Sequence, residues 1–307
     1  MTLKEDRFTG VLPAALTPLK DDLTPDDALM AKHCRWLLDN GATGLAILGT
    51  TGEANSLSLK ERIRIIDSLV EAGIPGSALM PGTGGCSITD CVELTRVAVN
   101  AGAGGVLMLP PFYYKNPSDE GLYAFFSEVI QRVADSRLQI YLYHFPQMSA
   151  TPINFNLIEM LVRVYPDTIT GMKDSSGVID NMTGAARNFP EFHVLSGADD
   201  LLLPLLKEGG AGAITACANV CVSTLSEIYM GFQNGKDVSN LHSQVAAIRK
   251  TIAKFPLSAA LKQLVSRHTN NDQWLRLRPP LALLSDAEVK QLYAEFDSIG
   301  YDLPEAA

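Results

Sequence analysis

Short apolar or β-branched runs alternate along the chain with longer stretches of helical periodicity. The apolar runs lack the polar alternation of strands that face water, and are typical of strands buried on both faces of a parallel sheet. With a repeat of about 25 to 35 residues, the pattern predicts eight strand–helix units closed into a (β/α)8 TIM barrel of the α/β class. The expected strands cover residues 10–16, 44–48, 77–80, 105–109, 139–143, 168–172, 193–196 and 213–215.

Helical periodicity fills the spaces between these strands, and Thr24 is the expected N-cap of the first helix. After the last strand the chain continues with helical segments only. The pattern therefore predicts a barrel over residues 1–218 and a helical extension over residues 219–307, packed on the barrel without a Pro/Gly/Ser-rich linker. The expected helices within the barrel cover residues 25–39, 59–71, 88–101, 120–133, 156–164 and 198–207.

Composition narrows the class of protein. A chain of 307 residues with 47% hydrophobic residues can bury one large α/β core. A net charge of −9 provides no clustered basic surface, and so argues against nucleic acid and anionic membranes as partners. The chain lacks an apolar run of about 20 residues and an apolar core near its start, which favours the cytoplasm. Neither the five cysteines nor the five histidines have ligand-like spacing, so no metal is expected.

Lys173 ends the apolar run of the sixth expected strand. A lysine in this setting buries much of its stem, and burial favours the neutral amine, which can form a Schiff base with a carbonyl compound. Strand alternation places Gly171 beneath Lys173 inside the barrel and turns Asp174 away from it. Lys173 is therefore the first candidate for covalent catalysis.

Other unusual residues follow strands that would end at the same mouth of the barrel, where catalytic groups of such barrels lie. The second expected strand runs into the turn GTTGE at 49–53, whose amides and hydroxyls suit a carboxylate. The fourth runs into PFYY at 111–114, and the fifth ends in YHFP at 143–146. These segments would line one mouth together with Lys173.

The motifs GTTGE, PFYY, YHFP and GMKDSSG, in this order, resemble those of the dihydrodipicolinate synthase and N-acetylneuraminate lyase family of pyruvate-dependent class I aldolases. The resemblance continues from VLPAALTPL near the start to RPPLALLS near the end. It implies a barrel with extra C-terminal helices, no cofactor, and a homotetramer built as a dimer of dimers. The implied substrates are pyruvate, or a longer 2-oxo acid, and an aldehyde.

The same resemblance implies roles for individual residues. Lys173 matches the imine-forming lysine, and Tyr143 matches the tyrosine that moves protons at the substrate. Thr50 matches a hydroxyl that links two tyrosines in a proton relay. The second tyrosine, which reaches across the dimer interface, is Tyr113, with Tyr114 as the alternative because the PFYY run leaves the alignment open.

Further residues would contact the substrates. Thr51 and the neighbouring amide of Gly52 match the site of the pyruvate carboxylate, and the backbone carbonyl of Ile214 matches one near the keto acid. Gln147 and Ser175 would line the mouth where the second substrate binds.

The second substrate is where this sequence departs from dihydrodipicolinate synthases. They carry an arginine for the aldehyde's carboxylate two residues after the proline of YHFP, and here that residue is Met148. Losing such a charge-assisted contact costs more than about 1.5 kcal/mol of binding. After Lys173 the chain also has Asp174-Ser175, in place of the Phe-Thr usual in sialic acid lyases.

The expected mouth is rich in hydroxyls and also includes Asp199. Such groups suit a neutral polyhydroxylated or aromatic aldehyde end better than a second carboxylate or a phosphate. The mouth therefore favours an aldolase or dehydratase of a 2-keto-3-deoxy sugar acid or a related 2-oxo acid. One alternative is a 4-hydroxy-tetrahydrodipicolinate synthase that binds its aldehyde without an arginine. Another is a barrel that binds keto acids without turnover.

Overall fold

A computed structural model describes residues 7–305 of the chain. Its regular strands form one curled parallel sheet in the order β1-β6-β5-β4-β3-β2. Every strand residue is buried, as expected when both faces of a sheet are covered. The strands are β1 (Gly10–Pro13), β2 (Val106–Met108), β3 (Ile140–His144), β4 (Ile169–Asp174), β5 (His193–Ser196) and β6 (Gly212–Thr215).

Two of the expected strands, at 44–48 and 77–80, close the sheet through isolated parallel bridges instead of regular ladders. Ala14 pairs with Ala46, Leu45 with Leu79, and Gly82 with Leu107 of β2. Regular pairing is interrupted because Leu48 has a φ of 57° and the helical turn η2 (Gly76–Ala78) replaces the start of the third strand. The predicted eight-fold barrel is confirmed, with six regular strands and two bridging segments.

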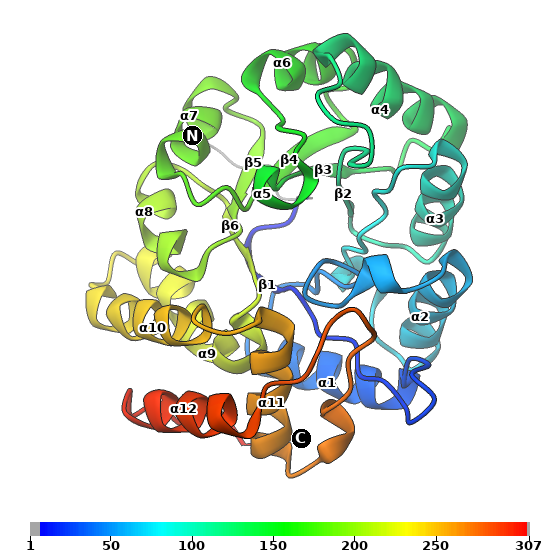
Figure 1. Cartoon of the computed structure of the whole chain (residues 1–307). Coiled ribbons are helices and arrows are strands. Elements are labelled where there is room, and N and C mark those ends of the chain that lie inside the picture. Colours follow the sequence, from blue (N-terminus) through cyan, green and yellow to red (C-terminus); the bar gives the residue numbers. More distant parts are fainter. Residues whose placement is uncertain (1–6, 306–307) are drawn as a thin grey trace.

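A ring of helices surrounds these strands (Figure 1). The expected helices are present within two residues of their predicted ends, except that α8 starts four residues late and follows the turn η3 (Asp199–Leu201). Helix α7 and the one-turn helix α5 were not among the predicted ones. The ring and its turns comprise α1 (Asp27–Asp39), η1 (Ala54–Ser56), α2 (Leu59–Glu71), α3 (Ile88–Asn100), α4 (Asp119–Val133), α5 (Pro146–Ser149), α6 (Phe155–Val164), α7 (Ile179–Asn188), α8 (Leu202–Lys207) and α9 (Ala218–Gln233).

The N-cap of α1 differs from the prediction. Asp26 caps the helix, because its carboxylate accepts a hydrogen bond from the amide of Leu29. Thr24 lies two residues earlier and donates its hydroxyl to Asp22 at 2.6 Å. The prediction of Thr24 as the cap was wrong, since either residue type can cap a helix and only the local turn decides between them.

The end of the chain is helical, as the pattern predicted. Helices α10 (Ser239–Ile252), α11 (Leu257–Thr269) and α12 (Asp286–Asp297), with the turn η4 (Asp272–Trp274), gather on one side of the barrel near α1 and α9 (Figure 1). Helix α9 follows β6 directly and packs against β1. The domain boundary at residue 218 remains a prediction.

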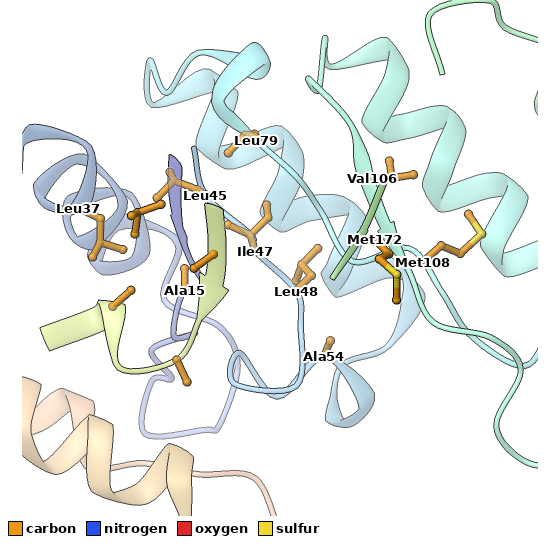
Figure 2. Packing of buried hydrophobic residues seen from close by; sticks show 14 of the residues in the cluster. Ala15, Leu37, Leu45, Ile47, Leu48, Ala54, Leu79, Val106, Met108 and Met172 are labelled. Carbon is orange, nitrogen blue, oxygen red and sulfur yellow. The ribbon is translucent and has the colours of Figure 1, made fainter. Parts of the chain in front are cut away.

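Two apolar cores hold the barrel together. The larger core lies between the sheet and the surrounding helices; Figure 2 shows members such as Leu37 of α1, Leu45, and Val106 of β2. The smaller core fills the barrel lumen, and its members come from every segment of the barrel wall except β4. They are Leu12, Ala14, Ala46, Met80, Leu107, Tyr141, Tyr143, Leu195, Ala211 and Ile214.

Tyr141 closes the lumen beneath the mouth. Its ring fits because Gly105 and Gly171 lack side chains, and a Cβ on either residue would approach the ring to 2.8 Å. The Tyr141 hydroxyl accepts a hydrogen bond from the backbone amide of Phe8 at 2.8 Å. The N-terminal segment thereby seals the end of the barrel opposite the carboxyl ends of the strands.

Among the helices of residues 7–305, none combines the length and the apolar character needed to cross a membrane.

Candidate active site

Lys173 and Tyr143 lie side by side at the carboxyl ends of neighbouring strands. They are register partners in β4 and β3, and the Lys173 side chain is only 5% exposed. The Lys173 Nζ atom lies 4.5 Å from the centroid of the Tyr143 ring. Gly171 lies two residues before Lys173, with the Tyr141 ring against it, as alternation predicted. The sheet therefore holds a lysine amine against an aromatic face in a nearly dry setting.

This arrangement can support covalent chemistry at a carbonyl carbon. The Tyr143 ring stacks against Phe145 with centroids 5.7 Å apart, which fixes the surface beneath the amine. A lysine amine in a desolvated, apolar pocket is a nucleophile that forms imines with carbonyl compounds. The phenol of Tyr143 belongs to the same site and can exchange protons there.

The GTTGE turn adjoins Tyr143, since its first two residues line one cavity with that side chain. Gly52 approaches the backbone of Ala15 so closely that a Cβ would lie 2.8 Å from its carbonyl oxygen, so a larger residue would displace the turn. Thr17 donates its hydroxyl to the Gly52 carbonyl at 2.8 Å. Thr51 is buried and Thr50 is half-buried. Contacts with Ala15 and Thr17 therefore fix the conformation of the turn.

Thr50 and Tyr143 line one small cavity of about 20 Å³, together with Leu107 and Leu109. Among the hydrogen bonds of residues 7–305, none joins the Thr50 hydroxyl directly to Tyr143. A single water molecule fits a space of this size. The structure thus brings these two predicted relay members to one cavity.

A buried ion pair anchors the turn from behind. Glu53 has a left-handed backbone (φ 57°), and its carboxylate accepts hydrogen bonds from Lys262 of α11 and from the backbone amide of Arg278 at 3.0 Å. Lys262 also donates to the Arg276 carbonyl at 2.7 Å. Burial lowers the pKa of Lys262, while the neighbouring Glu53 raises it. No local pattern predicts this pair, because its members are 209 residues apart.

The predicted relay tyrosine lies away from this cluster within one chain. Tyr113 is 73% exposed and Tyr114 is 78% exposed. Their rings contact each other edge to face, with centroids 5.4 Å apart. Which of the two serves the relay, and whether it does so from a partner subunit, stays a prediction.

The remaining predicted substrate contacts lie around the mouth. Ile214 is fully buried in the lumen core, and Gln147 donates its amide to the carbonyl of Ser176 at 2.6 Å. Ser175 lies over Gly197, where a Cβ would lie 2.1 Å from the serine hydroxyl. Gln147 and Ser175 therefore occupy the rim formed by β3, β4 and β5.

Two carboxylates near the mouth have structural roles. Asp174 is fully buried and accepts hydrogen bonds from the amide of Ser176 at 2.7 Å and from the side chain of Asn181 at 2.6 Å. Asp199 is also fully buried, and it pairs with Arg249 of α10 at 3.4 Å. The prediction that Asp199 lines the mouth was wrong, because the η3 turn directs its carboxylate toward α10.

His144 faces away from the lysine. Its Nδ1 atom accepts a hydrogen bond from the amide of Ile153 at 3.0 Å. Burial lowers the pKa of His144, and the nearby Asp174 carboxylate opposes this shift. The imidazole is therefore a buried acceptor for the backbone.

A larger cavity of about 480 Å³ opens beside Thr50 and Thr51. Met148, the start of α11 and the loop at 277–282 complete its wall. The sequence analysis did not predict a role for these last two segments, because nothing in their local pattern indicates a cavity. Within residues 7–305, no group of three or more His, Cys, Asp or Glu side chains is arranged to hold a metal ion.

Comparisons with known proteins agree with this geometry. The model of the dihydrodipicolinate synthetase family matches residues 7–298. An uncharacterized DapA-like lyase of Chloroflexus aurantiacus and a 4-hydroxy-tetrahydrodipicolinate synthase of Methanococcoides burtonii are each 33% identical to the chain over 292 residues, which cover 94% of this chain and 96% of each relative.

Solved structures show the same fold. The dihydrodipicolinate synthase of Agrobacterium tumefaciens superimposes with a TM-score of 0.89 at 32% identity, covering 95% of this chain and 99% of that one. A prophage protein of the dihydrodipicolinic acid synthase family from E. coli K12, solved in complex with pyruvate, gives a TM-score of 0.87 at 25% identity, with the same coverage.

Proposed function

The chain belongs to the dihydrodipicolinate synthetase family, and from this premise we propose that Lys173 forms a Schiff base with pyruvate or with a longer 2-oxo acid. The protein is a pyruvate-dependent lyase of the class I aldolase type. Enzymes of this family use a Schiff-base lysine and no metal cofactor. The observation that carries the proposal is the buried Lys173 amine, 4.5 Å from the Tyr143 ring at the carboxyl end of β4.

The reaction begins when the Lys173 amine attacks the ketone and water leaves. The resulting iminium withdraws electrons, so that a proton can leave the adjacent methyl carbon and an enamine forms. Tyr143 moves protons at this centre, and Thr50 connects Tyr143 to Tyr113 of a second subunit in a homotetramer. A phenol loses its proton poorly at neutral pH, so such a connected path is needed for turnover.

The keto acid's carboxylate would lie at the GTTGE turn. The hydroxyl of Thr51 and the amide of Gly52 donate hydrogen bonds to it, and the Ile214 carbonyl lies on the other side of the bound acid. Support comes from the fixed conformation of the turn, which Thr17 and the Glu53–Lys262 pair hold in place. Preorganised donors of this kind bind an anion without a full positive charge.

The enamine then adds to an aldehyde, or forms when a longer 2-oxo acid is cleaved. We propose a 2-keto-3-deoxy sugar acid or a related 2-oxo acid as the longer substrate. Support comes from Met148, which is 62% exposed where an arginine would be needed to hold a second carboxylate. Gln147 and Ser175 supply neutral polar groups at the same rim.

A second candidate is 4-hydroxy-tetrahydrodipicolinate synthase, which condenses pyruvate with aspartate semialdehyde. It is favoured by the 33% identity to the Methanococcoides burtonii enzyme of that name. Purified enzyme given pyruvate and either aspartate semialdehyde or neutral aldehydes separates the two activities. A kcat/KM that is highest with aspartate semialdehyde would select the synthase.

The imine itself is tested by borohydride reduction in the presence of pyruvate, followed by intact-protein mass spectrometry. We expect a pyruvate-sized adduct on the wild type and none on Lys173→Ala. If the wild type traps a longer 2-oxo acid but not pyruvate, the pocket is specialised for the larger substrate. An adduct that persists in Lys173→Ala would refute the assignment of the lysine.

A further inference from the structure

The cavity beside the GTTGE turn has both neutral polar and apolar side chains in its wall. The neutral polar residues are Thr50, Thr51, Asn55, Ser56 and Ser258, and the Ser258 hydroxyl donates to the Thr51 carbonyl at 3.2 Å. Apart from Glu53, the rest of the wall consists of the apolar side chains of Met148, Pro256, Leu257, Ala259, Leu277, Pro280, Leu281 and Ala282. Since Thr50 also lines the cavity of Tyr143, the two cavities adjoin at this residue. We infer that this cavity binds the aldehyde portion of the substrate, and that the far end of this portion is uncharged and apolar, as in an aryl or branched alkyl aldehyde.

The charges of the side chains that line the cavity disfavour binding of an anionic substrate end. Glu53 is the one ionisable side chain among the residues that line the cavity, and its two oxygens are taken by Lys262 and the Arg278 amide. A carboxylate or phosphate of the substrate would therefore enter an uncharged space without a cation to compensate its desolvation.

The cations carried by α11 and by the loop that form this wall are already paired. Lys262 is fully buried against Glu53, and Arg276 pairs with Asp21. The Arg278 guanidinium contacts Glu61 and donates to the carbonyl of Ser56 at 2.6 Å. Leu277 lies between the two arginines in the chain and lines the cavity, so this loop presents its apolar side chain to the substrate and uses its charges elsewhere.

The volume of the cavity and the exposure of its apolar side chains suit an aldehyde with an apolar end. A space of about 480 Å³ lies within the range of about 300–1,000 Å³ typical of small-molecule sites, and exceeds what pyruvate needs. Met148 and Leu281 are 62% and 43% exposed at the cavity. An apolar substrate end would cover these side chains and remove their surface from water.

The chemistry remains that of the proposed function, on which this inference rests. The enamine carbon bonds to the aldehyde carbon, and the aldehyde oxygen takes up a proton. Water then hydrolyses the imine, which releases a 4-hydroxy-2-oxo acid and restores the Lys173 amine. Of the two substrate types proposed above, such a cavity favours a 2-oxo acid with an apolar end over a fully hydroxylated 2-keto-3-deoxy sugar acid.

The test uses the cleavage direction in the full-length enzyme. Two 4-hydroxy-2-oxo acids, one made from benzaldehyde and one from glyceraldehyde, are cleaved, and released pyruvate is measured with lactate dehydrogenase. We expect kcat/KM to be at least tenfold higher for the benzaldehyde-derived acid. An equal value, or a higher one for the glyceraldehyde-derived acid, would overturn the inference.

Two variants test whether the preference for the benzaldehyde-derived acid arises in this cavity. Leu281→Asp places a charge in the cavity, and Leu283→Asp places the same charge two residues on, at a leucine that is 51% exposed and outside the cavity wall. We expect Leu281→Asp to lower kcat/KM for the benzaldehyde-derived acid at least tenfold, with Leu283→Asp unchanged. Equal effects of the two substitutions would contradict the inference.

Two further measurements distinguish a wrong assignment of the cavity from a failure of imine formation or of subunit assembly. Borohydride trapping of pyruvate should remain normal in Leu281→Asp, and a wild type that traps no 2-oxo acid would refute the imine chemistry instead. Light scattering after size exclusion should give the same mass for the wild type and both variants. A smaller mass for Leu281→Asp alone would assign this leucine to a subunit interface and overturn its role in substrate binding.

Discussion

Replacing Lys262 with methionine should destabilise the protein far more than removing a surface lysine. Lys262 and Glu53 are almost fully buried, so Lys262→Met leaves an unpaired carboxylate inside the protein, with the Arg278 amide as its remaining donor. Breaking a buried pair by removing one partner costs about 3–5 kcal/mol. For a chain of 307 residues, this corresponds to a fall in Tm of about 5–8 °C.

The chain offers a matched control. Lys254 pairs with Glu295 at the surface, where the two side chains are 47% and 27% exposed. Exposed pairs contribute about 0–1 kcal/mol, so Lys254→Met should change the free energy of unfolding little. The double variant Glu53→Gln with Lys262→Met removes both charges and should recover much of the loss.

The assay is urea unfolding, with the free energy extrapolated to water, together with the pyruvate dependence of borohydride trapping at 25 °C. Because Glu53 directly follows Thr51 and Gly52, we also expect Lys262→Met to need more pyruvate for half-maximal trapping. If Lys262→Met and Lys254→Met lower the free energy of unfolding equally, the argument for a buried anchor fails.

Three other substitutions test the site and its surroundings. Tyr143→Phe should lose most turnover but still form the imine with Lys173 slowly, as followed by trapping over time; normal turnover would exclude Tyr143 as the proton carrier. Met148→Arg should raise kcat/KM with aspartate semialdehyde while leaving neutral aldehydes unimproved, and no gain would place the carboxylate elsewhere. The hydrogen bond from Arg278 lowers the pKa of Glu61 to about 2 from 4.5, so its contribution to stability is complete above pH 4.5 and is lost as the pH falls toward 2. The fall in stability over this window, measured by urea unfolding, should be shallower in Glu61→Gln, and identical slopes would show that the pair has no linkage to pH.

The sequence predicted the barrel and the place of Lys173 because both depend on local pattern. Apolar runs locate strands, alternation gives their faces, and a strand's carboxyl end gives the mouth. The pairing of Lys173 with Tyr143 follows from neighbouring strands in register. The irregular segments at 44–48 and 77–80 were predicted as strands because apolar content does not report a positive φ such as that of Leu48.

Contacts between distant segments could not be predicted in this way. The direction of Asp199 depends on the η3 turn and on Arg249, which comes 50 residues later. The loop at 277–282 follows α11 to the cavity, and its own sequence, apolar apart from Arg278, does not indicate this contact. Such features require the packed fold, since no periodicity links them.

The sealed lumen restricts the order in which the two substrates can bind. Tyr141 and Phe8 close the barrel below Lys173, so among residues 7–305 the way to the lysine is the mouth at the strand ends. In the proposed reaction pyruvate would occupy the inner position, and an aldehyde bound in front of it would stand in its path. We therefore expect a fixed sequence in synthesis, with the keto acid first to arrive and excess aldehyde acting as an inhibitor that competes with it.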